Sequence, residues 1–288
     1  MSLLSAAAGG ILLPEEVGPL ILQPLRALST AIRISTEVTT GSSKFRLPVV
    51  QLDAAANWLA EAADITETDP TIGEEVVTPL KVGALTKVSN ELANDSSPAA
   101  TSVVGDGLVR SIARKVDLAF FGNTTPLGPN GLPSLTGIAT VTAPGSAWSN
   151  FDWAIEAQSQ LERVGSTVTA FAASFETVRQ LSEVKRFVGT TASSNEPLLQ
   201  ADDVSTAQPR SIFGVPLFSL PEGVIADGTV WALDRAKVYA VIRHDIGVVV
   251  DPSFFFGSDS LAVRVIMRIG FGYPHHAAVC KISLGGGS

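Results

Sequence analysis

The sequence contains few of the residues that build metal and redox sites. One cysteine, Cys280, and three histidines occur among its 288 residues. A single thiol excludes an internal disulfide and a zinc site made of several cysteines. His275 and His276 are adjacent, so on a strand they point to opposite faces and cannot easily ligate one metal together. We therefore expect no metal and no other cofactor, and we interpret Cys280 as a small buried hydrophobic residue.

Charged residues are also scarce. Only 17% of the chain is Asp, Glu, Lys or Arg, against about 25% in a typical soluble domain, and the mean hydropathy is +0.30. No apolar run approaches the roughly 20 residues of a membrane helix, and the first residues lack the basic start of a signal peptide. Apolar surface without a bilayer indicates burial between subunits. The net charge of −8 argues against direct nucleic-acid binding, because phosphate contacts need clustered Lys and Arg.

Motifs of catalysis are missing as well. His244 and Asp245 are neighbours, but no serine lies in a G-x-S-x-G turn that would complete a hydrolase triad. Gly270 and Gly272 belong to no G-x-G-x-x-G pattern and precede no Walker lysine. We therefore predict no catalytic residue and no enzyme activity.

The strongest positive signal is a long helix over residues 97–122. Ser97 is a suitable N-cap, Pro98 suits the first helical position, and Gly122 and Asn123 end the helix. Its apolar stripe is formed by Val104, Leu108, Ile112, Val116, Ala119 and Phe120. The polar side chains that we place mostly off this stripe are those of Asp106, Arg110, Arg114 and Asp117. At 1.5 Å per residue the helix would be roughly 36 Å long.

A second signal is an acidic segment, residues 51–79, between two expected strands. Residues 44–50 alternate as a strand, and another strand runs from about Val76 to Ala84. The segment has no Lys or Arg, and its main large apolar residues before Ile72 are Trp58 and Leu59. Its acidic residues are Asp53, Glu61, Asp64, Glu67, Asp69, Glu74 and Glu75.

We interpret residues 51–79 as a projecting hairpin that contacts a neighbouring subunit, with a solvated disordered loop as the alternative. A large aromatic residue in polar sequence is typical of an interface anchor. Opposite charge is a suitable partner surface, and the helix supplies it through Arg110, Arg114 and Lys115.

The segments at the two ends of the chain also have a predicted organisation. Residues 1–43 form an apolar arm that includes Leu20 and Leu22, and its regularly spaced prolines prevent a long helix. The arm could pack on its own subunit or on a neighbour, and we favour the neighbour. Residues 261–284 alternate as a long strand with a bend or bulge at Gly270 and Gly272, expected to pair with the strands near Lys44 and Val76.

The second half of the chain has the mixed helix and strand patterns of an α/β domain. A Gly/Pro-rich connector after the long helix marks the subdomain boundary. Helices are expected after Ser149 and over residues 175–187, and strands over 167–173, 230–233 and 238–242. A further strand from Ile246 is expected to end at Asp251-Pro252.

Taken in order, these features resemble the major capsid proteins of tailed bacteriophages, which have the HK97-type fold. The resemblance extends from about residue 13 to 284. It rests on the arm sequence LPEEVGPLI, the acidic hairpin with its Trp, a NEL-x-x-D turn, the long helix ending in Gly, the Pro-x-Gly connector that reaches a Gly-Ile pair, and FGVPL. Each motif is loose, but their order is specific.

The resemblance implies an α+β chain with four parts. These are an N-arm (1–43), an E-loop hairpin (51–79), a peripheral domain with the spine helix at about 97–122 (44–50, 80–145 and 251–288), and an axial α/β domain (146–250). In the family, axial domains meet around hexamer and pentamer axes, and the E-loop and N-arm reach over neighbouring subunits. The residues expected at such contacts are Trp58, Leu59, Glu61, Asp64, Glu67, Arg110, Arg114, Lys115, Leu20 and Leu22.

The implied function is structural. Copies would assemble through hexamers and pentamers into an icosahedral shell that encloses double-stranded phage DNA without binding it specifically. Assembly would take place in the host cytoplasm, without a membrane, and the product would be part of the virion. Scaffolding, protease, portal or decoration proteins are the expected partners.

Two departures from the family pattern lead to further expectations. Some members begin with a scaffolding-like segment that a protease removes, whereas this arm begins almost at Met1, so we expect that segment to be absent or supplied separately. Some members cross-link covalently through an E-loop lysine. No lysine lies between Lys44 and Lys81, so we expect a shell held together non-covalently.

Three alternatives are compatible with parts of the sequence. An encapsulin-type nanocompartment shell resembles the same fold at a similar length, but it would carry a cargo-docking inner surface, and the proline-spaced arm fits a phage shell better. An enzyme would use His244 and Asp245. A tail or adhesin subunit would form trimers or tubes. Particle size and DNA content would separate these possibilities.

Overall fold

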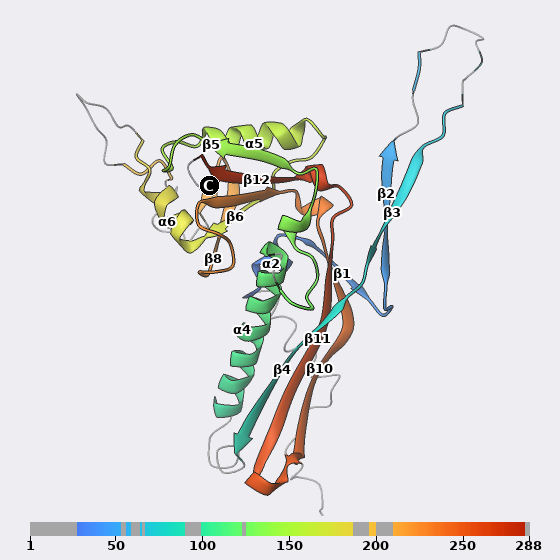
Figure 1. Cartoon of the computed structure of the whole chain (residues 1–288), viewed down its shortest axis with the longest axis vertical. Coiled ribbons are helices and arrows are strands. Elements are labelled where there is room, and N and C mark those ends of the chain that lie inside the picture. Colours follow the sequence, from blue (N-terminus) through green and yellow to red (C-terminus); the bar gives the residue numbers. More distant parts are fainter. Residues whose placement is uncertain are drawn as a thin grey trace, which may run out of the picture.

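The structure is a computed structural model. It describes residues 28–52, 56–58, 64, 67–89, 99–122, 125–186, 196–199 and 210–285. A long narrow sheet with one long helix beside it forms the elongated part of the molecule (Figure 1). A second sheet with two helices lies at one end of it, and a two-stranded hairpin projects to one side. The fold is α+β.

The elongated part is a four-stranded sheet packed against α4 (Ala99–Phe121). The strand order is β1 (Thr36–Thr40), β10 (Tyr239–Phe255), β11 (Ser260–Gly272) and β4 (Leu80–Ser89). The 23 residues of α4 confirm the predicted long helix, although Ser97, Pro98 and Asn123 lie outside the described residues. Its buried stripe consists of Leu108, Val109, Ile112, Ala113, Val116, Ala119, Phe120 and Phe121.

Asp117 differs from the prediction that it lies off the apolar stripe. Only 4% of it is exposed, and its carboxylate faces the short helix α2 (Thr30–Arg33). Oδ1 accepts hydrogen bonds from Ser29 Oγ at 2.7 Å and Ala31 N at 2.9 Å, and Oδ2 accepts one from Thr30 N at 3.2 Å. Burial raises the pKa of Asp117, while these hydrogen bonds act in the opposite direction. The carboxylate therefore ties the segment that precedes β1 to the long helix.

The second sheet has six strands. Their order is β5 (Ala139–Ala143), β12 (Val279–Leu284), β9 (Thr229–Leu233), β6 (Ala170–Ser174), β8 (Val215–Leu220) and β7 (Ser211–Ile212). Helix α5 (Asp152–Glu162) packs on β5 and β12, and α6 (Phe175–Glu183) packs on β6 and β8. The opposite face, which carries Ala172, Trp231 and Val279, joins the core around α4. One hydrophobic core therefore links the two sheets.

Short 3-10 turns connect several of these elements. They are η1 (Leu132–Ser134), η2 (Arg235–Lys237), η3 (Phe256–Ser258) and η4 (His276–Ala278). No helix in the described ranges is both long enough and apolar enough to cross a lipid bilayer.

The strand pairing differs from the prediction at the C-terminal end of the chain. Residues 261–284 form two strands in different sheets: β11 pairs with β4 as expected, but β12 pairs with β5 and β9. Strand β10 also continues through Asp251-Pro252, with a register shift between Asp251 and Phe255, instead of ending there. A proline is tolerated at such an irregularity because the ladder loses its hydrogen bond there anyway.

Because of these pairings, some residues belong to a different sheet from the one expected from the predicted domain limits. Residues 139–143 and 279–284 belong to the six-stranded sheet, and residues 239–250 belong to the four-stranded sheet. The limits expected at residues 145/146 and 250/251 therefore do not coincide with the limits of the two sheets.

Candidate assembly surfaces

The hairpin of β2 (Phe45–Leu52) and β3 (Thr71–Val77) projects from the body of the molecule (Figure 1). Among the described strands, β2 pairs with β3 and not with β11, so the expected pairing of the Lys44 strand with the C-terminal segment is wrong. Thr78 and Pro79 separate β3 from β4, whereas we expected one strand from about Val76 to Ala84. Val50, Ile72 and Val76 are exposed on this hairpin, Ile72 to 65%. The hairpin therefore offers apolar surface for a contact.

The base of the hairpin is packed closely against the end of β11. Leu47 and Val77 are buried in a small cluster with Val241. A Cβ on Gly272 would lie 2.5 Å from Leu47 Cδ1 and 2.7 Å from Val77 Cγ2, and a Cβ on Gly270 would lie 2.8 Å from Val77 Cγ1. Strand β11 keeps its register with β10 from Arg268 to Gly272, so there is no bulge at these two glycines. The two glycines are needed because the hairpin approaches so closely.

Two of the acidic residues of the predicted hairpin form polar contacts within their own chain. The Glu75 carboxylate accepts hydrogen bonds from the backbone N–H of Tyr273, with distances of 3.0 and 2.8 Å to its two oxygens. Glu74 forms an ion pair with Arg46 at 2.6 Å, and both side chains are largely exposed. An exposed pair of this kind contributes little to stability, whereas the Glu75 contact fixes the hairpin to β11.

The far part of the hairpin carries the predicted contact residues that the structure describes. Trp58 is fully exposed, and Asp64 and Glu67 are exposed as well. A bare indole is costly in water, and tryptophan is enriched at the centres of protein interfaces. The remaining predicted residues on the hairpin and the arm, Leu59, Glu61, Leu20 and Leu22, lie outside the described residues.

The predicted basic residues gather on one side of α4. Arg110, Arg114 and Lys115 are all exposed. Arg110 and Arg114, four residues apart, share one face of the helix, and Lys115 points about 100° to the side of Arg114. Arg114 Nη2 also donates to the backbone oxygen of Glu222 at 3.4 Å. In one chain, α4 and the hairpin lie on different parts of the molecule (Figure 1). A contact between the basic face and the acidic hairpin would therefore join two copies.

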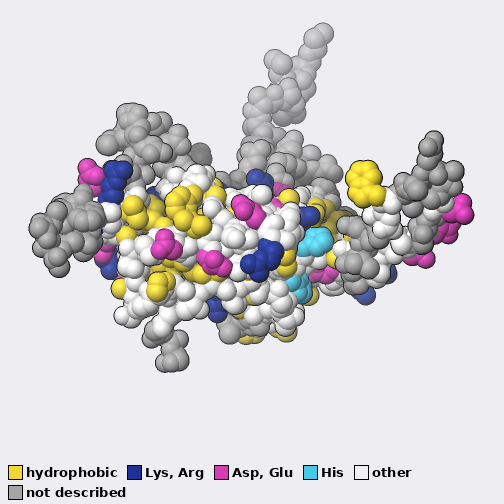
Figure 2. Space-filling view, turned by 90° about the horizontal axis from the view of Figure 1, so that it is seen from above, with side chains coloured by type: hydrophobic (Ala, Val, Ile, Leu, Met, Phe, Trp, Pro, Cys, Tyr) yellow, Lys and Arg dark blue, Asp and Glu magenta, His cyan; other side chains and the backbone are white. Residues whose placement is uncertain are grey.

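Sequence reasoning missed several exposed apolar side chains elsewhere. They are Leu127, Ile155, Val164, Phe175, Phe213 and Phe254. Phe213 is the most informative, since its φ of 50° is uncommon for a bulky residue and it forms the β7–β8 turn with Gly214. Figure 2 shows hydrophobic side chains exposed between charged ones on the face seen from above. Their scattered placement gave no periodic signal in the sequence.

The residues considered for metal binding and catalysis have ordinary surroundings where they are described. In the described part of the chain, no three side chains of His, Cys, Asp or Glu are grouped as a metal site. Burial raises the pKa of Cys280 to about 12, with a smaller effect of Glu156, so the thiol stays neutral. His276 Nδ1 lies 2.8 Å from Thr136 O. The side chains of His244 and Asp245 are outside those that the structure describes.

Comparison with known proteins gives one family and many related structures. The family model described as "Phage capsid family" matches residues 9–284. A chain of the solved structure of Microbacterium phage Oxtober96 is 16% identical with a TM-score of 0.70, and the match covers 89% of this chain and 91% of that one. A chain of Mycobacterium phage Bobi is 18% identical with a TM-score of 0.68, covering 90% and 91%.

A third similar structure is the capsid of a native GTA particle, at 17% identity and a TM-score of 0.64, with 88% of each chain covered. No curated protein matches the sequence. At these identities the solved structures establish a shared fold, and the family model extends over nearly the whole chain.

Proposed function

Because the chain belongs to the phage capsid family and is a major capsid protein of the HK97-like fold, we propose that its copies assemble through hexamers and pentamers into an icosahedral shell around double-stranded DNA. The protein is a virion component, and its homo-oligomeric assembly follows from the family. The observation that carries the proposal is the projecting hairpin, with Trp58 fully exposed, because a second copy is needed to cover such a limb.

Each part of the chain would have its own role in assembly. The four-stranded sheet and α4 form the peripheral domain, and the six-stranded sheet with α5 and α6 forms the axial domain around the hexamer and pentamer axes. Residues 1–27 would act as the N-arm. The expected limit at residue 43 is too late, because α2 and β1 pack in the body of the subunit. The hairpin with the residues between β2 and β3 would act as the E-loop. This division follows the sheets, so it shifts the limits expected from the sequence.

The principal contact would join the acidic hairpin of one copy to the basic face of α4 on the next. Asp64 and Glu67 are exposed on one side of this contact, and Arg110, Arg114 and Lys115 on the other. Charge complementarity of this kind sets register and excludes wrong partners more than it adds affinity. The apolar area around Trp58 would supply the affinity. A standard interface buries about 1,600 Å² in total.

The shell would enclose DNA without a specific binding site. A net charge of −8 makes the protein a poor ligand for phosphates, and a wall that held the genome tightly would impede packaging and release. Scaffolding, protease, portal and decoration proteins are the proposed partners, and the host cytoplasm is the proposed place of assembly. The encapsulin reading is not favoured, since the family match is to phage capsids.

Assembly gives the direct test. Purified protein at high concentration, viewed by negative-stain microscopy, should show closed shells of uniform diameter. The same particles on a denaturing gel should run as a single band at the 30.0 kDa of the monomer, because the hairpin segment has no lysine for a covalent cross-link. A compact monomer at all concentrations would contradict the proposed function, and a ladder of bands would contradict non-covalent assembly.

Charge reversal tests the proposed contact between hairpin and helix. A double Asp64→Lys and Glu67→Lys variant should raise the concentration needed for assembly at least tenfold, since like charges then meet. A double Arg110→Glu and Arg114→Glu variant, at two positions that share one face of α4, should do the same. Combining all four substitutions in one chain restores opposite charges and should recover assembly. Light scattering against protein concentration measures the effect.

A control exchanges two exposed charges at the C-terminal end of α5, with Glu162→Lys and Arg163→Glu, and should leave assembly unchanged. If the combined variant assembles no better than either double variant, the two surfaces do not face one another in the shell.

A further inference from the structure

The connector that follows α4 holds a leucine in an unfavourable conformation and in water. Leu127 is 95% exposed, and its φ is 60°, in the left-handed region that branched side chains avoid. The backbone N–H of Gly128 donates to Thr125 O at 3.1 Å, which closes a turn with Pro126 second and Leu127 third. A positive φ at the third position of such a turn favours Gly or Asn. Within the described part of its own subunit, this leucine therefore gains little from burial and has a strained backbone.

The turn holds Leu127 in a fixed position. Pro126 restricts its own φ, and Gly128 packs tightly, since a Cβ there would lie 2.9 Å from Thr125 Cγ2. Leu132, further along the same connector, is fully buried in the core. An exposed apolar side chain on a pre-organised backbone loses little freedom when it binds. Leu127 is therefore suited to anchor a contact with another molecule.

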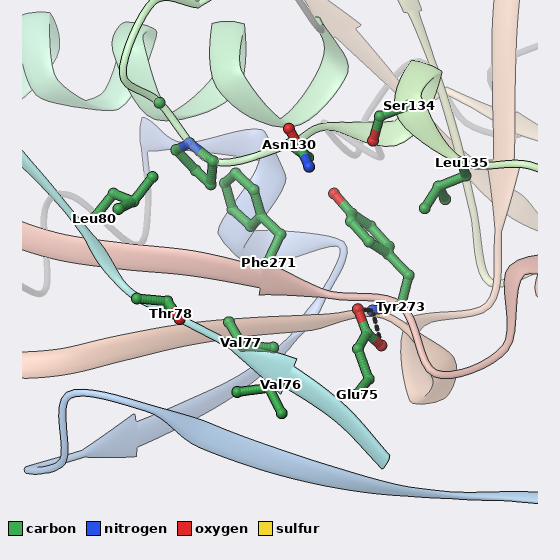
Figure 3. Close-up of a pocket in the computed structure, with 12 residues that line it drawn as sticks. Glu75, Val76, Val77, Thr78, Leu80, Asn130, Ser134, Leu135, Phe271 and Tyr273 are labelled. Atoms are coloured by element: carbon green, nitrogen blue, oxygen red, sulfur yellow. Dashed lines mark hydrogen bonds between the residues drawn. The ribbon is translucent and has the colours of Figure 1, made fainter. Parts of the chain in front are cut away.

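A cavity of about 390 Å³ opens directly beside this turn, at the base of the hairpin (Figure 3). Residues 75–80 at the end of β3 and the start of β4 form one wall. Connector residues from 128 to 135 form another, and the end of β11 forms the third. Leu127 does not line the cavity of its own chain, because its side chain is directed into solvent.

The walls of this cavity offer apolar surface. Val76 and Leu80 line it with 43% and 37% of their surfaces exposed, and Leu135 is half-buried there. Figure 3 shows the Phe271 side chain directed from β11 toward the connector at Asn130. An aliphatic side chain that entered the cavity would therefore meet apolar groups from more than one wall.

We propose that Leu127 of one copy inserts into this cavity on a second copy, and that the second copy's Leu127 returns the contact across a two-fold axis. The inference rests on the proposed shell, because icosahedral symmetry provides two-fold axes between subunits. It adds a contact that involves neither the acidic end of the hairpin nor the basic face of α4.

Reciprocity follows from the position of the leucine beside the cavity. Leu127 immediately precedes Gly128, the first connector residue of the cavity wall. When one copy places its Leu127 in the cavity of another, its own cavity therefore lies next to the other copy's Leu127. A surface that carries both a protrusion and the matching hollow is self-complementary, as a two-fold contact requires.

The contact would bury no unpaired charge from the groups that form it. Residues 125–135, which comprise the turn and the connector wall, include no charged residue. Among the lining residues that the structure describes, Glu75 alone is charged, and its carboxylate already accepts the hydrogen bond of the Tyr273 backbone N–H. Val76, Leu80 and the entering leucine would all lose apolar contact with water, which favours association.

Substitution of Leu127 separates its effect on folding from its effect on assembly. Leu127→Asn suits the left-handed backbone better but removes the apolar side chain. Isolated subunits of this variant should unfold at the same or a higher denaturant concentration than the parent protein. The protein concentration at which half of the subunits assemble should rise at least tenfold. Leu127→Met keeps an apolar side chain of similar volume and should assemble within about twofold of the parent.

Two results of these measurements would overturn the inference. One is equal assembly of the Leu127→Asn variant and the parent protein. The other is a lower unfolding midpoint of isolated Leu127→Asn subunits, because the leucine would then support its own subunit instead of a second copy.

Disulfide trapping in assembled shells tests where the leucine docks. Chains with Leu127→Cys are assembled together with chains that carry Thr78→Cys on the opposite wall of the cavity, and the natural Cys280 is buried. Each chain then has one accessible thiol, so a dimer band on a non-reducing gel reports a bond between two copies. Mild oxidation should give this band, because a disulfide needs Cα atoms within about 7 Å.

The matched control uses Ser159→Cys, on the exposed side of α5, in place of Thr78→Cys and should give no dimer. Shells that form without a dimer from Leu127→Cys and Thr78→Cys chains overturn the inference and leave the shell function intact. A dimer that forms equally well in the control also overturns it, because the bond would not need the cavity. Failure of the parent chain to form any shell is evidence against the proposed function itself.

Chains that carry both Leu127→Cys and Thr78→Cys test the two-fold relation. A reciprocal contact joins the same two copies twice, so oxidation should give dimers and no longer products. A ladder of trimers and larger products would show a head-to-tail contact and would overturn the proposed two-fold axis.

Discussion

Replacing Gly131 with alanine is expected to destabilise the folded subunit by at least about 3 kcal/mol. A Cβ at this position would lie 2.2 Å from Gly122 O, 2.3 Å from Ala119 O and 2.5 Å from Phe120 O. All three are backbone oxygens at the end of α4, so no side-chain rotation can relieve the overlap. The helix end and the connector would have to separate.

The energetic cost is large because this contact lies over the centre of the core. Phe120 is fully buried, and its ring packs edge-on against Phe121 and Phe271, with ring centroids 4.9 Å apart in each case. Moving the end of α4 opens these contacts, and loss of a buried aromatic side chain typically costs about 3–5 kcal/mol. Gly131 was expected only as part of the connector at a subdomain boundary, but this connector is packed into the core through Leu132.

Chemical denaturation followed by circular dichroism measures the effect on the Gly131→Ala subunit. The matched control is Gly41→Ala, at a loop glycine with nothing within 4 Å of the added Cβ. The control should be neutral or slightly stabilising, because it only reduces the freedom of the unfolded chain. Equal midpoints for the two variants would mean that the connector can move away from α4 at little cost.

The sequence predicts well those elements whose signal is local. The stripe of α4 repeats every three to four residues, and the helices and inner strands of the α/β half carry similar periodic patterns. The existence of the hairpin also follows locally, from two strands around a long acidic stretch. In each case the residues that define the element are neighbours in the chain.

Features that depend on packing between distant segments were not predictable in this way. From the sequence, Asp117 is expected to be an exposed helix residue. In the structure α2 packs over it, so its carboxylate is buried and accepts hydrogen bonds. Gly270 and Gly272 suggested a bend, because a close approach by Leu47 and Val77 leaves no trace in the sequence around them. Glu75 looked equivalent to its acidic neighbours until the register of β3 placed it against Tyr273. These misses share one cause, since the partner lies far away along the chain.

The same limit applies to the candidate contact residues. Composition marked the hairpin and the basic face of α4 as charged and complementary, but it could not separate Glu74, paired with Arg46, from exposed Asp64 and Glu67. The residues that can contact a second copy are those whose side chains make no contact within their own subunit. These residues can be identified only once the fold is known.

The second large effect is expected for assembly rather than for folding. A double Gly270→Ala and Gly272→Ala variant should still fold, with a loss of about 1–3 kcal/mol, because the groups nearest to Gly272 are ends of the Leu47 and Val77 side chains. Around Gly270 the backbone of Thr78 and Pro79 is also close, with Thr78 O at 3.2 Å. The hairpin base must therefore shift as a unit away from β11.

Such a shift would be magnified along the projecting hairpin and would carry Trp58 away from its contact on the neighbouring copy. In the proposed shell every subunit gives one hairpin and receives another, so each copy would take part in two weakened contacts. We expect the protein concentration at which half of the subunits sediment as shells to rise at least tenfold, which corresponds to a loss of about 1.4 kcal/mol per subunit. Gly257→Ala, with no atom within 4 Å of the added Cβ, is the matched control and should assemble normally. Normal shells from the double variant would mean that the hairpin adapts on contact, and that its direction is set by the neighbour instead of by the close packing on β11.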